Sequence, residues 1–167
     1  WTSTFDEAAH LEHPVARRRL TAAKSLRLED CTKNAAIKTI ASAAVHESAE
    51  PGARVLVVCN TIDRARAVHT LLSKELRGTL EPLLLIGRSR QFDREAIVRK
   101  VVKLFDADRL PSGDQAILVA TQTVEVGIDL DATALVTEST AWDSLVQRIG
   151  RVNRRGDRTE ASIVVVH

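Results

Sequence analysis

Residues 147–156 read QRIGRVNRRG and hold four arginines, one glutamine and only two aliphatic side chains. If residues 143–155 form a helix that advances about 100° per residue, Gln147, Arg151 and Arg154 lie together on one polar stripe. Two guanidinium groups beside an amide suit a phosphate ligand, because the guanidinium fork matches phosphate oxygens. The spacing therefore predicts phosphate chemistry on this stripe. The alternative is a helix face that is simply solvated.

The side of this helix opposite the stripe is apolar. Leu145, Ile149 and Val152 cluster there, so we expect them to pack on the rest of the fold. Gly156 is expected to end the helix. Three further arginines lie off the stripe, and for these we expect salt bridges or solvation: Arg148, Arg155 and Arg158.

The elements that must position this helix alternate between strands and helices. Near-continuous apolar, β-branched runs predict strands covered on both faces at residues 55–59, 83–86, 116–120, 132–137 and 161–166, with 25–28 as a weaker sixth. Amphipathic spacing predicts helices over residues 32–48, 62–76 and 93–105, the second capped by Asn60 or Thr61 and the third by Asp93. This alternation predicts an α/β fold with a mainly parallel central sheet and helices on both faces.

In folds of this kind, ligands bind beyond the carboxyl ends of the strands, where the loops gather. The loops to consider therefore follow Cys59, Ile86, Ala120 and Thr137. Several of the polar residues in these loops are candidates for ligand contact.

Length and composition set the class of protein. A chain of 167 residues with 44 % hydrophobic and 28 % charged residues is typical of one globular domain. No apolar run approaches the roughly 20 residues of a membrane span, and a net charge of +2 indicates no particular partner. Cys31 and Cys59 belong to no CxxC motif, which favours two reduced, packed thiols in a cytoplasmic protein without a metal site.

The chain contains no methionine and opens on Trp1. We therefore expect it to be an internal piece of a longer polypeptide. Residues 1–22 are predicted to form a peripheral helix or connector, and residues 23–167 the folded domain.

Two segments carry a resemblance to a known family. QRIGRVNRRG resembles motif VI, QxxGRxxR, of superfamily two helicases, and ATQTVEVGIDLD resembles their motif V. The wording of both is most similar to that of the CRISPR-associated helicase-nuclease of type I interference systems. The resemblance is strongest over residues 117–156. It implies that residues 23–167 form the second RecA-like domain of a helicase, a three-layer fold.

The resemblance implies roles for the arginine stripe. Arg151 and Arg154 match the arginine fingers that reach the γ-phosphate of ATP held by a partner domain. Gln147 would contact the same phosphate region or the attacking water. Loss of either arginine is expected to abolish turnover while the fold stays intact.

The motif V resemblance also implies a cofactor-binding set. Gly127 and Asp129 match positions that approach the nucleotide, and the carboxylate suits ribose hydroxyls. Glu125 matches an acidic position of the CRISPR-type motif, without an assigned partner. For Asp129 the alternative is an ordinary turn or capping residue.

Nucleic-acid contacts are implied for the loops at the strand ends. Thr121 and Gln122 are placed to hold a backbone phosphate, a contact that positions without reading sequence. Asn60 and Thr61 match motif IV, where the N-terminus of a helix attracts an anion; the alternative is plain helix capping, and the two roles are compatible. A further family motif, His-Ser-Arg, binds the nucleic-acid backbone. Only its arginine is present in this sequence, as Arg88.

The sequence lacks a GxxxxGK[ST] loop, a DExx strand end and a His-Asp cluster of the nuclease type. The resemblance therefore implies that Mg-ATP is bound mainly by a missing first RecA-like domain and that this chain alone is inactive. Single-stranded DNA and an RNA-guided surveillance complex are the other expected partners. With five aromatic residues, phosphate contacts rather than base stacking should dominate DNA binding.

Two alternatives stay open. One is a non-catalytic RecA-like module for docking or regulation. The other keeps the motor but makes it a restriction-type translocase or an RNA helicase.

Overall fold

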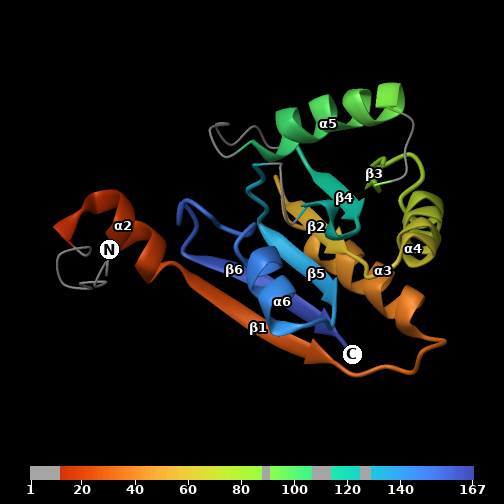
Figure 1. Cartoon of the computed structure of the whole chain (residues 1–167), viewed down its shortest axis with the longest axis horizontal. Helices are drawn as coiled ribbons and strands as arrows, with labels where there is room; N and C mark the ends of the chain where they lie inside the picture. The colour runs from red at the N-terminus through yellow and green to blue at the C-terminus, as the bar shows by residue number, and fades with distance from the viewer. Residues whose placement is uncertain (1–11, 88–90, 107–113, 125–128) are drawn as a thin grey trace.

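A single sheet of six parallel strands runs through the centre of the molecule, in the order β1-β6-β5-β2-β4-β3 (Figure 1). The computed structural model describes residues 12–87, 91–106, 114–124 and 129–167. The strands are β1 (Ala23–Glu29), β2 (Arg54–Val58), β3 (Leu83–Leu85), β4 (Ala116–Ala120), β5 (Ala134–Glu138) and β6 (Glu160–Val166). All six strands predicted from apolar runs are confirmed, with ends shifted by a few residues.

Helices cover both faces of this sheet. They are α3 (Ala36–Glu47), α4 (Ile62–Glu75), α5 (Gln91–Phe105) and α6 (Trp142–Ile149). A further helix, α2 (Pro14–Thr21), precedes β1 and lies outside these layers, and a short 3₁₀ turn, η1 (Gln122–Val124), follows β4. Because α5 begins at Gln91, the prediction of Asp93 as its N-cap is wrong.

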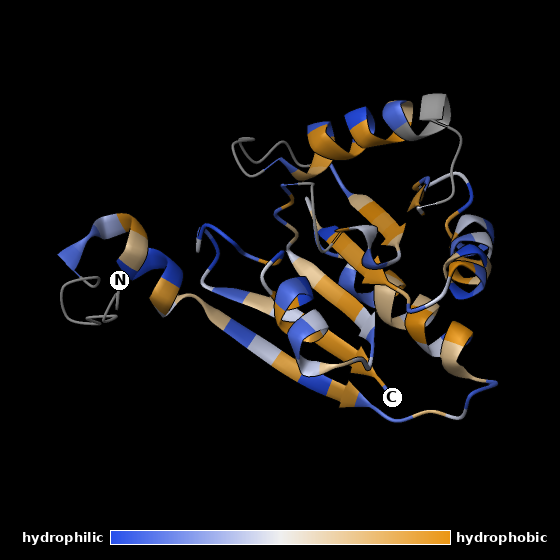
Figure 2. Ribbon diagram, viewed as in Figure 1, coloured by the Kyte–Doolittle hydropathy of each residue, from blue (hydrophilic) through white to orange (hydrophobic). Residues whose placement is uncertain are grey.

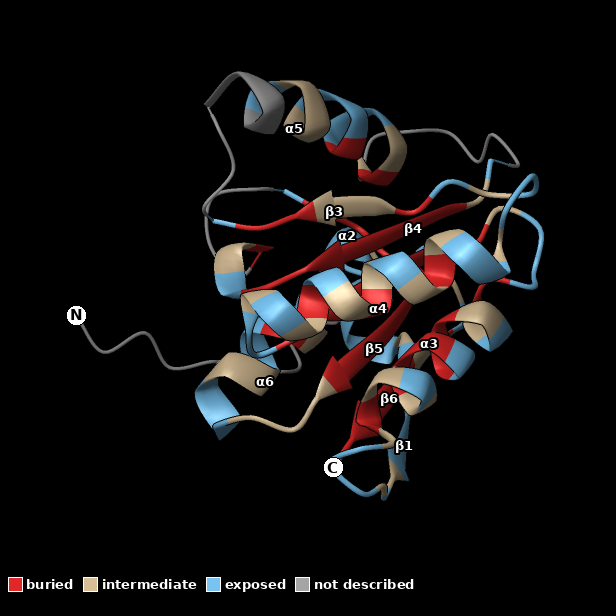
Figure 3. Ribbon diagram, turned by 90° about the vertical axis from the view of Figure 1, so that its right-hand side faces the viewer, coloured by how far each residue is buried: buried red, intermediate tan, exposed pale blue. Residues whose placement is uncertain are grey.

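Side chains alternate between the two layers along each buried strand. Val55 and Val57 of β2 point into the layer that contains α3 and α4. Leu56 and Val58 point into the opposite layer, which contains α5 and α6. Figure 3 shows α3 and α4 lying over one face of the central strands, which are buried along their length. The predicted three-layer α/β architecture is confirmed.

β1 and α2 lie outside this well-covered core. β1 is the edge strand beside β6, and six of its seven residues are exposed. Figure 2 shows β1 and α2 with mixed hydropathy, whereas the central strands are mostly hydrophobic. α2 buries none of its residues, consistent with the predicted peripheral helix. The domain boundary near residue 22 stays a prediction.

None of the helices in the described part of the chain is both long enough and apolar enough to span a bilayer.

Candidate functional site

The helix that carries the arginine segment is shorter than the sequence predicts. α6 ends at Ile149 with Gly150 as its C-cap, so the predicted helix over residues 143–155 is wrong beyond that point. Leu145 and Ile149 pack on the sheet as expected. Arg151 and Arg154 do not continue the helix, and they share no helical stripe with Gln147.

The backbone after Gly150 forms hydrogen bonds with the end of motif V instead. Val152 makes a parallel bridge with Ala132, the Ala132 N–H donates to the Arg151 carbonyl (2.9 Å), and the Asn153 N–H donates to the Ala132 carbonyl (2.9 Å). These long-range bonds replace the helical ones that the local sequence would otherwise favour. Residues 150–156, called the arginine loop below, are therefore attached to the strand-like segment that precedes β5.

Asn153 gives the arginine loop its shape. Its backbone is in the left-handed region (φ 44°), which asparagine tolerates better than most residues. The buried side chain donates to the Arg158 carbonyl (2.8 Å) and accepts from the Arg158 N–H (3.1 Å). The two hydrogen bonds between the Asn153 side chain and the Arg158 backbone close the loop, so the role of Asn153 is structural.

The side chains of Arg154 and Asp129 form an ion pair across the arginine loop. The structure brings these two predicted site residues together, although they were assigned to the phosphate and the ribose. Both side chains are accessible, at 43 % and 69 % exposure, and exposed ion pairs are worth little net free energy. Arg154 can therefore exchange this partner for another anion at small cost. Gln147 is exposed on α6, and Arg151 is half-buried.

Asp131 is a functional candidate that the sequence analysis missed. It is buried at 5 % exposure, and its Oδ1 accepts the Arg154 backbone N–H at 2.8 Å. Burial raises the pKa of Asp131 above its ordinary value, against the opposing effects of that hydrogen bond and of the Arg54 and Lys24 charges. The only signal in the sequence was a second carboxylate two residues after Asp129.

The raised pKa predicts a pH-dependent stability for the 167-residue chain. The native state binds the Asp131 proton more tightly than the unfolded state, so this contribution is complete below an unfolded pKa of about 3.9. It is lost as pH rises through the higher native pKa. Asp131→Asn keeps an oxygen that can accept the Arg154 N–H and removes the titration, so its stability relative to wild type should increase across this window.

Denaturant unfolding at a series of pH values from about 3 to 7 measures this difference. The exposed carboxylate Asp30, just after β1, provides the control as Asp30→Asn. If the two variants differ from wild type by amounts that do not change with pH, Asp131 does not titrate as described.

Polar residues at the carboxyl ends of β2 and β4 form a second region. Thr61 caps α4, since its Oγ1 accepts from the Arg64 N–H at 3.2 Å, which confirms the capping interpretation. Thr121 is buried at 3 % exposure, and Gln122 is exposed at the start of η1. Arg88, Glu125 and Gly127 lie outside the described residues.

Asn60 lines a pocket of about 310 Å³ at this carboxyl edge. Lys33, Arg64 and His167 contribute to its walls, as does Glu138, which pairs with Arg64 at 3.1 Å. Cations and an amide around one open pocket can hold a phosphate group. The pocket lies far along β5 from the arginine loop, which contacts Ala132 at the amino end of that strand.

Arg148 was expected to be solvated or to form a salt bridge, and the expectation of solvation is wrong. The residue is 2 % exposed and donates hydrogen bonds to Thr137 and Asn60. The signal was present in the helical spacing, because position 148 is one turn from Leu145 on the inward side of α6. The sequence alone did not show which acceptors would surround the guanidinium.

The Cys59 thiol lies close to this network. Burial, and then the Glu138 charge, raise the pKa of Cys59 to about 12 in spite of Arg64 and Arg148. The thiol is therefore protonated and unreactive at neutral pH. Cys31 is half-buried and also free. Among the described residues, no group of His, Cys, Asp and Glu side chains is arranged to hold a metal ion.

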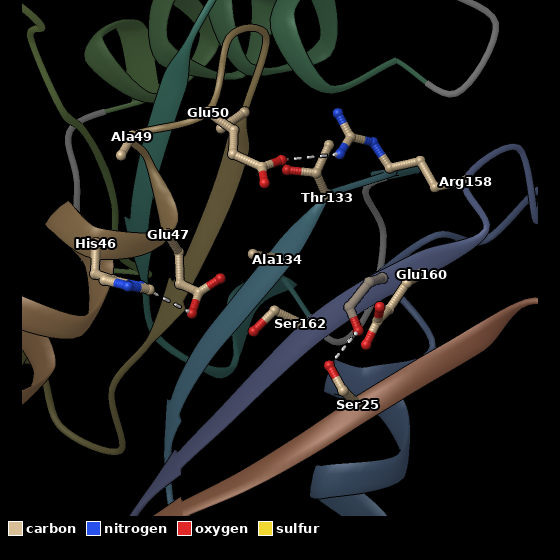
Figure 4. Close-up of a pocket in the computed structure, with 12 residues that line it drawn as sticks. Ser25, His46, Glu47, Ala49, Glu50, Thr133, Ala134, Arg158, Glu160 and Ser162 are labelled. Atoms are coloured by element: carbon tan, nitrogen blue, oxygen red, sulfur yellow. Dashed lines mark hydrogen bonds and ion pairs between the residues drawn. The ribbon is translucent and has the colours of Figure 1, made fainter.

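A larger pocket, of about 430 Å³, lies at the amino ends of β1, β5 and β6 on the α3 side (Figure 4). Its wall includes Glu47, Glu50 and Glu160, and the Arg158 guanidinium approaches Glu50 at 3.9 Å. None of the predicted site residues that the structure describes lines it. The pocket is therefore separate from the described residues of the two motifs.

This chain is similar to proteins that are much longer than it. It is 38 % identical over 118 residues to the CRISPR-associated helicase Cas3 of Thermoproteus tenax, covering 70 % of this chain and 19 % of that protein. It is 35 % identical over 108 residues to the CRISPR-associated endonuclease/helicase Cas3 of Escherichia coli, covering 64 % and 12 %. The chain therefore spans less than a fifth of the length of these curated relatives.

The fold is also similar to that of solved structures. The crystal structure of T. fusca Cas3 matches with a TM-score of 0.72 and 25 % identity, over 87 % of this chain and 18 % of that one. Crystal structures of the same protein with AMPPNP and ATP match with TM-scores of 0.71 and 0.70. The family model for the C-terminal part of the CRISPR-associated nuclease/helicase Cas3 matches residues 51–157, more than half of the chain. The arginine loop, motif V, and β5 and α6 between them all lie within that match, and the chain belongs to this Cas3 C-terminal family.

Proposed function

We propose that this chain is the second RecA-like motor half of an ATP-dependent DNA helicase that acts in CRISPR interference. The observation that carries the proposal is the attachment of the arginine loop to the end of motif V through Ala132 and Asp131. Two distant segments are thereby held as one rigid unit with Arg154 at its surface. A solvated helix face would need no such attachment.

The chemistry proposed for this unit is the stabilisation of charge during phosphoryl transfer. Arg151 and Arg154 approach the γ-phosphate of ATP that the first RecA-like domain holds, and Gln147 orients the same region. For Arg154 this requires exchange of Asp129 for the phosphate, and the exposure of the pair makes the exchange inexpensive. Asp129, once released, can accept hydrogen bonds from ribose hydroxyls.

The nucleotide reaches this chain on a partner domain. The chain has no phosphate-binding GxxxxGK[ST] loop, so Mg-ATP is bound mainly by the first RecA-like domain of the same protein. The structurally similar T. fusca Cas3 has been crystallised with ADP, AMPPNP and ATP, which supports nucleotide binding by the full-length protein. Glu125 and Gly127 are proposed to line it from motif V.

The carboxyl edge of the sheet is the proposed path of single-stranded DNA. Asn60, Thr61, Thr121 and Gln122 follow the carboxyl ends of β2 and β4, and Lys33 and Arg64 add positive charge beside Asn60. Arg88 is proposed to extend the same path. In interference, an RNA-guided surveillance complex would supply the displaced strand.

The direct test compares the full-length protein with this 167-residue chain. We expect ATP hydrolysis that is stimulated by single-stranded DNA in the former and none in the latter, since the ATP-binding domain is missing. Single-stranded RNA in a parallel assay separates a DNA motor from an RNA helicase. A full-length protein without ATPase in either assay would favour the docking module.

Lys33 offers a test of the DNA path in the full-length protein. Removing one phosphate-contacting cation should weaken single-strand affinity and reduce the slope of log affinity against log salt by about one. Lys33→Gln should show both effects. Lys74 is an exposed charge at the end of α4 that is remote from Asn60. Lys74→Gln should show neither effect. Equal salt slopes for the two variants would place the strand elsewhere.

A further inference from the structure

Arg148 is a buried cation that lies outside the arginine loop. The residue belongs to α6, yet its side chain points into the molecule and is 2 % exposed. Burying a cation costs free energy unless hydrogen bonds replace its lost hydration, and an apolar residue of similar size can often replace such a group without loss. The presence of a guanidinium here is therefore explained by the acceptors that it binds.

Three acceptors of Arg148 lie at the carboxyl edge of the sheet. Its Nη1 donates to the Thr137 Oγ1 at 2.8 Å and to the Glu138 carbonyl at 3.3 Å. Its Nη2 donates to the Asn60 Oδ1 at 3.1 Å. One side chain thus connects α6 to the end of β5 and to the loop after β2.

Asn60 is held tightly by the same surroundings. Its backbone N–H donates to the Glu138 carboxylate at 2.7 Å, and its side-chain amide donates to the Ser139 carbonyl at 2.8 Å. Glu138 is fixed in turn by Arg64 of α4 at 3.1 Å. With both ends of its amide bonded within the protein, Asn60 cannot move independently of α6.

Arg148 lies at the C-terminal end of α6, and this end leads directly into the arginine loop. The Ile149 carbonyl accepts from the Lys24 Nζ at 3.1 Å, and Arg151 follows the C-cap Gly150. Arg148 immediately precedes Ile149, the last residue of the helix, so only Ile149 and Gly150 separate it from Arg151. A shift of this short helix must displace Arg148 at the DNA-side edge and Arg151 at the nucleotide side together.

We infer that Arg148 is a positioning residue that couples nucleic-acid contact at Asn60 to the placement of the arginine loop. The inference rests on the proposed function of those two regions and assigns the connection between them. An arginine suits the task because its rigid fork of donors holds acceptors from two different elements at once. Neither Asn60 nor the arginine loop could then change position without the other.

The test uses the full-length protein with Arg148→Met, Asn60→Ala and the double variant. Methionine has a similar length and fills the buried space without directional donors. We expect the stimulation of ATPase by single-stranded DNA to fall about tenfold in Arg148→Met, with unstimulated hydrolysis changed less than about twofold. The double variant should be no worse than the poorer single variant, because both substitutions break one connection.

The matched control is Arg99→Met on the exposed side of α5, which should leave the stimulation ratio unchanged. Thermal unfolding of each variant reports folding. Should Arg148→Met not fold, Arg148→Lys, which keeps the charge but not the fork, takes its place in the cycle. An equal loss of stimulated and unstimulated rates, or effects that add in the double variant, would overturn the coupling.

The outcomes separate this inference from the proposed function. A wild-type protein without DNA-stimulated ATPase contradicts the proposed function itself. A wild-type protein with that activity, together with an Arg148→Met variant that keeps full stimulation, contradicts only the coupling through Arg148.

Discussion

Arg154→Ala in the full-length protein is expected to lower the kcat of ATP hydrolysis by about 10³- to 10⁵-fold, the usual contribution of an arginine that neutralises the transferring phosphoryl group. The fold should be retained, because the guanidinium is partly exposed and its partner Asp129 is mostly exposed. The backbone N–H that binds Asp131 is also unaffected by the substitution. Steady-state ATPase assays with saturating single-stranded DNA measure the effect.

Arg158→Ala is the matched control for this substitution. Arg158 lies two residues beyond Gly156, but its side chain turns toward Glu50 and the pocket on the α3 side of the sheet. Its loss removes the same charge and should change kcat by less than about threefold. Comparable losses in both variants would mean that local positive charge matters and not a specific guanidinium. Full activity in Arg154→Ala would remove the arginine-finger assignment.

Gly156→Ala is expected to be the most destabilising small substitution near the site. The residue has φ +70°, and an added Cβ would overlap the Arg18 carbonyl of α2. Left-handed backbone for a non-glycine residue costs about 1–3 kcal/mol, and α2 must also move away from the loop. The exposed ion pair between Arg18 and Asp157 (2.9 Å) would be lost with it. Denaturant unfolding of the 167-residue chain measures the loss.

Gly78 separates the two causes of this loss. It has a similar backbone angle, φ +84°, but an added Cβ there meets nothing within 4 Å. Gly78→Ala therefore measures the backbone cost alone, expected at about 1 kcal/mol. The excess in Gly156→Ala reports the contact with α2. Equal losses in the two variants would show that α2 does not press on the arginine loop in solution.

Much of the fold follows from local properties of the sequence. The runs at residues 55–59 and 116–120 are apolar at every position, and only a strand covered on both faces buries all of them. The spacing of Ile62, Ala65 and Val68 likewise specifies one buried face of a helix. β1 was the hardest strand to predict, because an edge strand with six exposed residues needs few apolar side chains.

The conformation of the arginine segment does not follow from its local sequence. Its residue types indicated phosphate chemistry, and its inward apolar side chains were identified correctly. Its helical geometry was wrong after Ile149, because Arg151 and Asn153 found backbone partners at Ala132, about twenty residues earlier in the chain. Helical periodicity carries no information about such a competitor.

The sequence by itself determined the kinds of element, their order and the residue types available for chemistry, since these depend on local hydrophobicity and on side-chain identity. Only the tertiary structure decided that Asp131 anchors Arg154, that Asn153 closes the loop and that Arg148 reaches Asn60. Each of these contacts joins polar groups whose alternative is burial without a partner. Which groups meet is set by the packing of the whole sheet and its helices.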